Sequence, residues 1–186
     1  MRSYYATLAD TELAHHTPSP DEDPQGLLYL TARYLEALRV RHYSPQTVYL
    51  RSKMLKPFRL FCEQAGISQA RQVTRAVIFN YQSYLYHRRK PNGDPTTAET
   101  QNHAISIVCH FFGWLTKQSL ILYNPASDIE YGRTGRRLPN AMLSPSEIET
   151  ILNIPNLDEP FGLRNRAILE VLYSTGMRRA EVCALN

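Results

Sequence analysis

Apolar residues recur at spacings of three and four positions throughout residues 27–118, and this period constrains the fold more than any other feature of the chain. It places apolar side chains on one face of an α-helix, whereas a half-buried strand would need strict alternation. Proline, glycine and polar residues divide the region into four such segments. The sequence therefore predicts an all-α architecture in which four amphipathic helices pack on one another.

The ends of these helices carry local signals. Ser44 can accept hydrogen bonds from the free N–H groups of the second helix, and Pro45 suits its first position. Pro57 lies inside the same helix, where a proline is expected to kink it or loosen one turn. The predicted helices span about residues 27–40, 45–65, 74–90 and 97–118.

The remaining residues differ in composition. Residues 1–26 hold several prolines and an acidic run, which predicts a flexible acidic N-terminal tail. Residues 131–143 contain three arginines, two glycines and no acid, which predicts a basic linker. We expect a four-helix domain at residues 27–130 and the start of a second domain at residues 144–186.

The second domain opens with a capping box over residues 144–147, which predicts a short helix to about Leu152. Further helices are expected over about 163–173 and from near Met177, with a tight turn at 174–176 between them. The last helix lacks a C-terminal stop signal, so we expect this second domain to be incomplete.

Composition argues against several classes of protein. No apolar run is long enough to span a bilayer, and the N-terminus lacks the apolar stretch of a signal peptide. Cys62, Cys109 and Cys183 are scattered and form neither a disulfide framework nor a CxxC metal site. His103 and His110 stand about 10 Å apart on one helix, which favours core or groove histidines over a metal pair. A cytoplasmic protein without a metal is expected.

Charge is distributed unevenly along the chain. Residues 27–143 hold 16 Lys+Arg against six Asp+Glu, a net charge of +10, whereas residues 1–26 carry −4 and residues 144–186 carry −2. A basic middle between acidic flanks is typical of a domain that binds a polyanion. An ordinary solvated helical surface is the alternative reading of the same charges.

Residues 163–181, LRNRAILEVLYSTGMRRAE, resemble the opening of the catalytic domain of the tyrosine site-specific recombinases, the phage integrase family, and most nearly its Xer-type members. The shared elements are the LRxRAIL helix, the YxTG turn, Arg178 two residues after Gly176, and Glu181. The four-helix region resembles the SAM-like core-binding domain of that family. Supporting positions are Asn124-Pro125, Leu138-Pro139, Leu143-Ser144 and Glu147.

The resemblance implies that Arg178 is the first catalytic arginine of the family. A planar guanidinium can bind two oxygens of a reacting phosphate, and a helix N-terminus after a glycine turn adds positive potential. Glu181, three positions later, could orient Arg178. An exposed Arg–Glu ion pair of little energetic value is the alternative.

The resemblance also implies what the chain binds and what it lacks. The family cuts and rejoins double-stranded DNA through a phosphotyrosyl intermediate, without a cofactor or a small-molecule substrate, and other recombinase protomers are further expected partners. It requires a Lys, a His-x-x-Arg pair, a further His or Trp and a nucleophilic Tyr, all after the first arginine. No tyrosine of this chain matches the nucleophile, so we expect DNA binding without strand cleavage.

The family's second and fourth helices face the major groove, so cationic and polar residues there become candidate DNA contacts. A helical projection places Lys53, Lys56 and Arg59 roughly opposite the apolar face of the second helix. The aromatic residues Phe111, Phe112 and Trp114 of the fourth helix are expected in the core. A stand-alone DNA-binding regulator, or a helical module that meets an acidic partner, remains an alternative. The candidate contacts are Lys53, Lys56, Arg59, Gln101, Asn102, His103 and Ser106, with Arg133, Arg136 and Arg137 in the linker.

Overall fold

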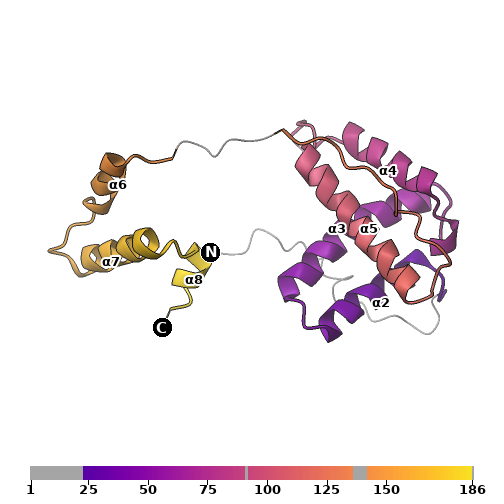
Figure 1. Cartoon of the computed structure of the whole chain (residues 1–186), viewed down its shortest axis with the longest axis horizontal. Helices are drawn as coiled ribbons and strands as arrows, with labels where there is room; N and C mark the ends of the chain where they lie inside the picture. The colour runs from indigo at the N-terminus through magenta and orange to yellow at the C-terminus, as the bar shows by residue number, and fades with distance from the viewer. Residues whose placement is uncertain (1–22, 91, 136–141, 186) are drawn as a thin grey trace. The chain divides into compact units, whose positions relative to one another are not determined.

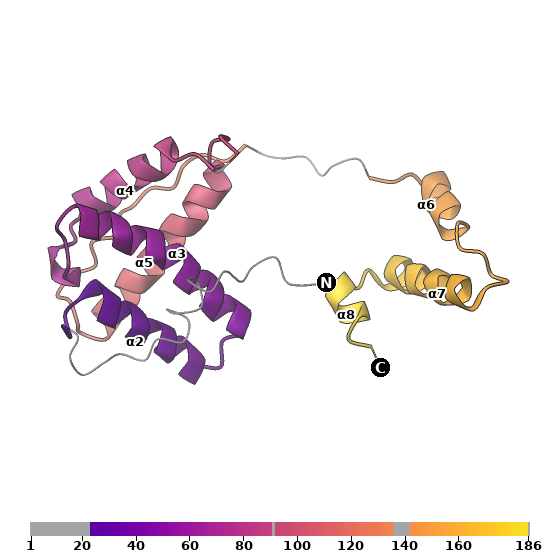
Figure 2. The same cartoon turned by 180° about the vertical axis from the view of Figure 1, so that it is seen from behind.

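The computed structural model describes residues 23–90, 92–135 and 142–185 of the chain. Its internal contacts divide the chain between Gly135 and Arg136 into two compact units, a division that falls inside the predicted linker. The described residues form helices and two isolated β-bridges but no strand, so the predicted all-α class is confirmed. Figures 1 and 2 show α2 to α5 in the first unit and α6 to α8 in the second.

The first unit, here called the helical unit, contains the four predicted helices. Ser44 caps α3 by accepting a hydrogen bond from the Thr47 N–H, and Thr97 caps α5 in the same way from Thr100. α3 continues as a helix through Pro57. The helices are α2 (Leu27–Val40), α3 (Pro45–Gln64), α4 (Arg75–His87) and α5 (Ala98–Lys117), with a 3₁₀ turn over Ala70–Gln72.

Aromatic side chains occupy the centre of the helical unit. The ring of Phe58 meets those of Tyr81 and Phe112 edge-on, with centroids 5.0 and 5.9 Å apart, which joins α3, α4 and α5. Tyr34 of α2 meets Phe111 in the same manner at 5.5 Å. Trp114 is also buried, so the prediction that the aromatic residues of α5 belong to the core is confirmed.

The chain enters the helical unit through a short pairing that the sequence did not indicate. Residues 23–26 lie against residues 68–70, where Leu27 N–H bonds the Ser68 carbonyl and Ala70 N–H bonds the Gln25 carbonyl. Asp23 accepts a hydrogen bond from the Gln69 side chain at 2.9 Å. Of the predicted N-terminal tail, residues 1–22 lie outside the described residues.

The second unit consists of α6 (Pro145–Leu152), α7 (Pro160–Thr175) and α8 (Arg179–Val182). The predicted capping box is present, since Ser144 and Glu147 exchange side-chain to backbone hydrogen bonds. Apart from Gly162, no described residue of this unit is buried. Large apolar side chains such as Ile154, Phe161 and Leu163 therefore remain exposed.

The predicted bounds of α7 and α8 were wrong by a few residues. α7 begins at Pro160, because proline fits a first helical position that needs no N–H donor. Ser174 and Thr175 belong to its last turn, where their hydroxyls donate to the carbonyls of Glu170 and Val171. The turn is confined to residues 176–178, and α8 begins at Arg179 instead of near Met177.

Replacing Gly162 with alanine is expected to loosen the second unit. A Cβ at this position would lie 1.7 Å from the carbonyl oxygen of Asn156, so the loop before α7 must move. Such overpacking costs about 1–3 kcal/mol. Hydrogen exchange over residues 153–165 should accelerate in this variant. Gly135→Ala, where a Cβ meets nothing within 4 Å, is the control, and equal exchange in both variants would contradict the prediction.

Candidate nucleic-acid interface

The three predicted cations of α3 are not equivalent. Lys53 and Lys56 are half-buried, and each makes at least one polar or electrostatic contact. Arg59 donates a 2.7 Å hydrogen bond to Glu63, and its side chain is only 14% exposed. The predicted outward placement of Arg59 was wrong, because it follows buried Leu55 by four positions and precedes buried Cys62 by three.

The polar residues predicted on α5 are mostly engaged within the protein. Gln101 donates to the Thr96 carbonyl at 2.8 Å, and Ser106 lies 3.4 Å from Nδ1 of His110. Asn102 forms two hydrogen bonds with Gly132, which lies 30 positions further along the chain. The side chain of His103 is exposed and makes no hydrogen bond with another described residue. The structure thus brings Asn102 to the start of the linker.

Of the three linker arginines, one lies within the part of the chain that the structure describes. Arg133 is exposed and follows Gly132 directly. Arg136 and Arg137 lie outside the described residues. Arg133 therefore carries its positive charge immediately after the point at which Asn102 holds the chain.

A cationic hollow that sequence reasoning missed lies among α2, α3 and α5. It encloses about 440 Å³, and no Asp or Glu is among its lining residues. Arg51 lies over the rings of Tyr34 and Tyr43, with its guanidinium carbon 5.7 and 5.5 Å from their centroids, and it also donates to the Tyr34 hydroxyl. Burial raises the pKa of Tyr34, which keeps that hydroxyl protonated. The other basic lining residues are Arg41, His110 and Lys117.

Arg178 occupies the turn between α7 and α8. Gly176 ends α7 with φ +65°, a left-handed conformation that suits glycine, and Arg178 is the N-cap of α8. Glu181 accepts a 2.8 Å hydrogen bond from the Arg178 backbone N–H and lies 3.3 Å from its Nη1. The predicted contact between the two residues is present, and 85% of the Arg178 side chain stays exposed.

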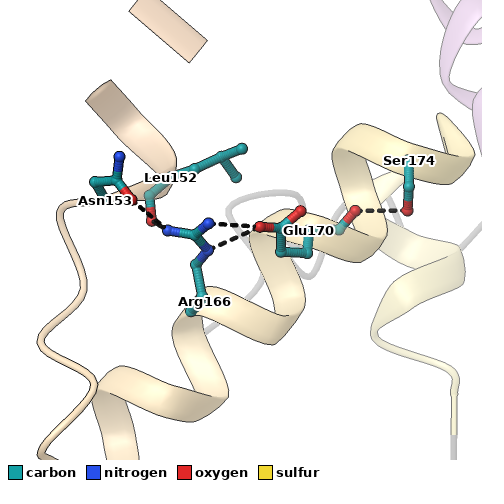
Figure 3. Close-up of polar contacts among 5 residues, drawn as sticks. All are labelled: Leu152, Asn153, Arg166, Glu170 and Ser174. Carbon is teal, nitrogen blue, oxygen red and sulfur yellow. Dashed lines mark hydrogen bonds and ion pairs between the residues drawn. The ribbon is translucent and has the colours of Figure 1, made fainter. Parts of the chain in front are cut away.

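Arg166 connects the two helices that precede this turn (Figure 3). Its Nη1 donates to the carbonyl of Leu152 at 2.5 Å and to Oδ1 of Asn153 at 2.8 Å. Its Nε donates to Glu170 at 2.8 Å within an i,i+4 ion pair. One guanidinium therefore binds the C-terminal end of α6 to α7.

The described residues lack two kinds of feature that would indicate another class of site. Over residues 23–90, 92–135 and 142–185, no cluster of three or more His, Cys, Asp or Glu side chains could hold a metal ion. Within the same described part of the chain, none of the helices combines the length and apolar character needed to cross a membrane.

Comparison with protein families gives two adjacent matches along the chain. Residues 30–122 match the N-terminal SAM-like domain of phage integrases, and residues 141–186 match the phage integrase family itself. The first match covers the region that forms α2 to α5, and the second covers the unit with Arg178.

Similar proteins agree with these matches. Tyrosine recombinase XerC 2 of Ralstonia nicotianae is 46% identical over 167 residues, 88% of this chain and 48% of the relative. XerD of Halalkalibacterium halodurans is 37% identical over 64% of this chain and 38% of its own length. XerC of Escherichia coli O157:H7 is 31% identical over 83% of this chain and 49% of its own length. The chain spans about half the length of these relatives or less. Together with the family matches, they show that it belongs to the phage integrase family of tyrosine recombinases.

Proposed function

We propose that this chain binds double-stranded DNA through its helical unit and linker, and that the 186 residues alone do not cleave it. The observation that carries the proposal is the net charge of +10 on residues 27–143, which include the match to the integrase SAM-like domain. Cations at this density supply the sequence-independent part of DNA binding by neutralising phosphates. The relatives are named tyrosine recombinases, which supports DNA as the polyanion.

Within this proposal, phosphate contacts come chiefly from Lys53, Lys56 and the three linker arginines. Arg59 contributes less, because its guanidinium already pairs with Glu63 and is largely buried. Exposed His103 is the best placed residue of α5 to reach a base edge, whereas Gln101 and Ser106 would first exchange an internal bond.

Arg178 supplies a further phosphate contact in this proposal. Glu181 holds one side of it, while most of the guanidinium is exposed and free to form a bidentate pair with phosphate oxygens. Turnover needs the other members of the family's catalytic set, and none of them is assigned within these 186 residues. Loss of members of a concerted catalytic set costs several orders of magnitude in rate.

The protein partners proposed for this chain are other recombinase protomers, and its proposed location is the cytoplasm. The family assignment supports the first proposal, and the free cysteines Cys62, Cys109 and Cys183 support the second.

One gel experiment tests both parts of the proposed function. The intact chain is mixed with a library of nicked duplexes designed to trap a covalent intermediate, and the products are separated under native and denaturing conditions. We expect a retarded complex on the native gel and free DNA alone on the denaturing gel. A band that survives denaturation would contradict the absence of cleavage, and an unretarded native band would contradict DNA binding.

A further inference from the structure

The segment Asp128–Gly132, here called the strap, lies along α4 and α5 and ends with the first two residues of the predicted linker. Side chains of those helices donate hydrogen bonds to the backbone carbonyls of every second residue of the strap. This is the period at which the carbonyls of an extended chain point to the same side. The bonds run from Arg75 to the Asp128 carbonyl at 3.3 Å, from Gln82 to the Glu130 carbonyl at 2.7 Å, and from Asn102 to the Gly132 carbonyl at 2.8 Å.

Asn102 attaches the strap through two hydrogen bonds. Its amide nitrogen donates to the Gly132 carbonyl, and its amide oxygen accepts from the Gly132 N–H, both at 2.8 Å. These two bonds imitate a pair of facing peptide groups in a β-ladder. Tyr131, the preceding residue, is 51% exposed. The hydrogen bonds between the strap and α5 therefore come from Asn102.

Engagement with Gly132 changes what Asn102 can do for DNA binding. An asparagine reads adenine by using its amide as a donor and an acceptor at once. Here the edge of the amide that could do so already serves Gly132, so bidentate reading of a base would require release of the strap, although one N–H and one lone pair remain. Arg133, the first arginine of the basic linker, is the next residue. The same two bonds thus determine where the linker arginines leave the helical unit.

We propose that Asn102, assisted by Gln82, is a positioning residue that anchors the strap so that Arg133, Arg136 and Arg137 reach DNA phosphates from a fixed origin. This role rests on the proposed function, because it assumes that the linker arginines bind DNA. When the strap is held on α5, the linker has less conformational freedom before it binds DNA. It therefore loses less conformational entropy on binding, and the affinity for phosphates is higher.

The anchor itself can be tested without DNA. In the intact chain, Asn102→Ala removes both bonds to Gly132, and hydrogen exchange over residues 130–133 should accelerate about ten-fold. His103→Ala is the matched control, because the side chain of this neighbour on α5 is exposed and makes no hydrogen bond with another described residue. Gln82→Ala, which removes one bond from α4, should accelerate exchange less. Unchanged exchange in Asn102→Ala would overturn the anchor.

A double-mutant cycle tests the positioning role on DNA. Asn102→Ala should weaken binding to all duplexes by a similar factor, and this effect should vanish in a chain in which the three linker arginines are alanine. Base reading by Asn102 would instead change the preference among sequences and persist in the arginine-free chain, which would overturn the proposal. Absence of DNA binding by the unaltered chain would overturn the proposed function and the positioning role together, while the exchange experiment would still decide the anchor.

Discussion

Replacing Phe58 with alanine is expected to lower the free energy of unfolding of the helical unit by about 3–5 kcal/mol. Phe58 is 1% exposed, and its ring contacts Tyr81 of α4 and Phe112 of α5. The change removes buried apolar surface and two aromatic contacts, and the three surrounding helices can close the cavity only in part. The free energy of unfolding of small domains is about 5–15 kcal/mol, so this substitution is expected to remove a large part of it.

Urea unfolding followed by far-ultraviolet circular dichroism measures this effect. Phe79→Ala is the matched control, since it removes the same ring from a position on α4 that is 63% exposed. The control should stay within about 0.5 kcal/mol of the unaltered protein. Equal urea midpoints for the two variants would show that the packing around Phe58 does not hold α3, α4 and α5 together.

The second large effect concerns the salt dependence of DNA binding. Each phosphate neutralised by a cation adds about −0.9 to the slope of log affinity against log salt. Contacts from Lys53, Lys56, the three linker arginines and Arg178 predict a slope of about −5.4. The double variant Lys53→Ala, Lys56→Ala should reduce it to about −3.6. Fluorescence anisotropy titrations at several salt concentrations give both slopes.

Arg164→Ala serves as the control for this comparison. Arg164 lies on α7 of the second unit, with its guanidinium carbon 5.2 Å from the ring centroid of Phe161, outside the proposed interface. Its loss should leave the slope unchanged. Equal slopes in the lysine double variant and the unaltered chain would remove α3 from the interface.

Features that depend on neighbouring residues were predictable from the sequence. The four helices of the helical unit appear within a few residues of their predicted bounds, because the apolar period and the caps at Ser44 and Thr97 act over one or two turns. The capping box at Ser144 and the contact between Arg178 and Glu181 are equally local.

Features that depend on distant residues were not predictable. Nothing near Asn102 in the sequence indicates that Gly132, 30 positions away, uses its amide. The pairing of residues 23–26 with 68–70 is non-local in the same sense. Arg59 shows a different limit: a helical projection placed it roughly opposite the apolar face, but its spacing from buried Leu55 and Cys62 puts it on the buried side of α3.

The affinity of the intact chain for a duplex of mixed sequence, measured by anisotropy at about 50 and about 200 mM salt, tests DNA binding most directly. We predict saturable binding at the lower concentration and an affinity about 2,000-fold weaker at the higher one. Failure to bind at low salt, or an affinity that does not change between the two concentrations, would contradict the account.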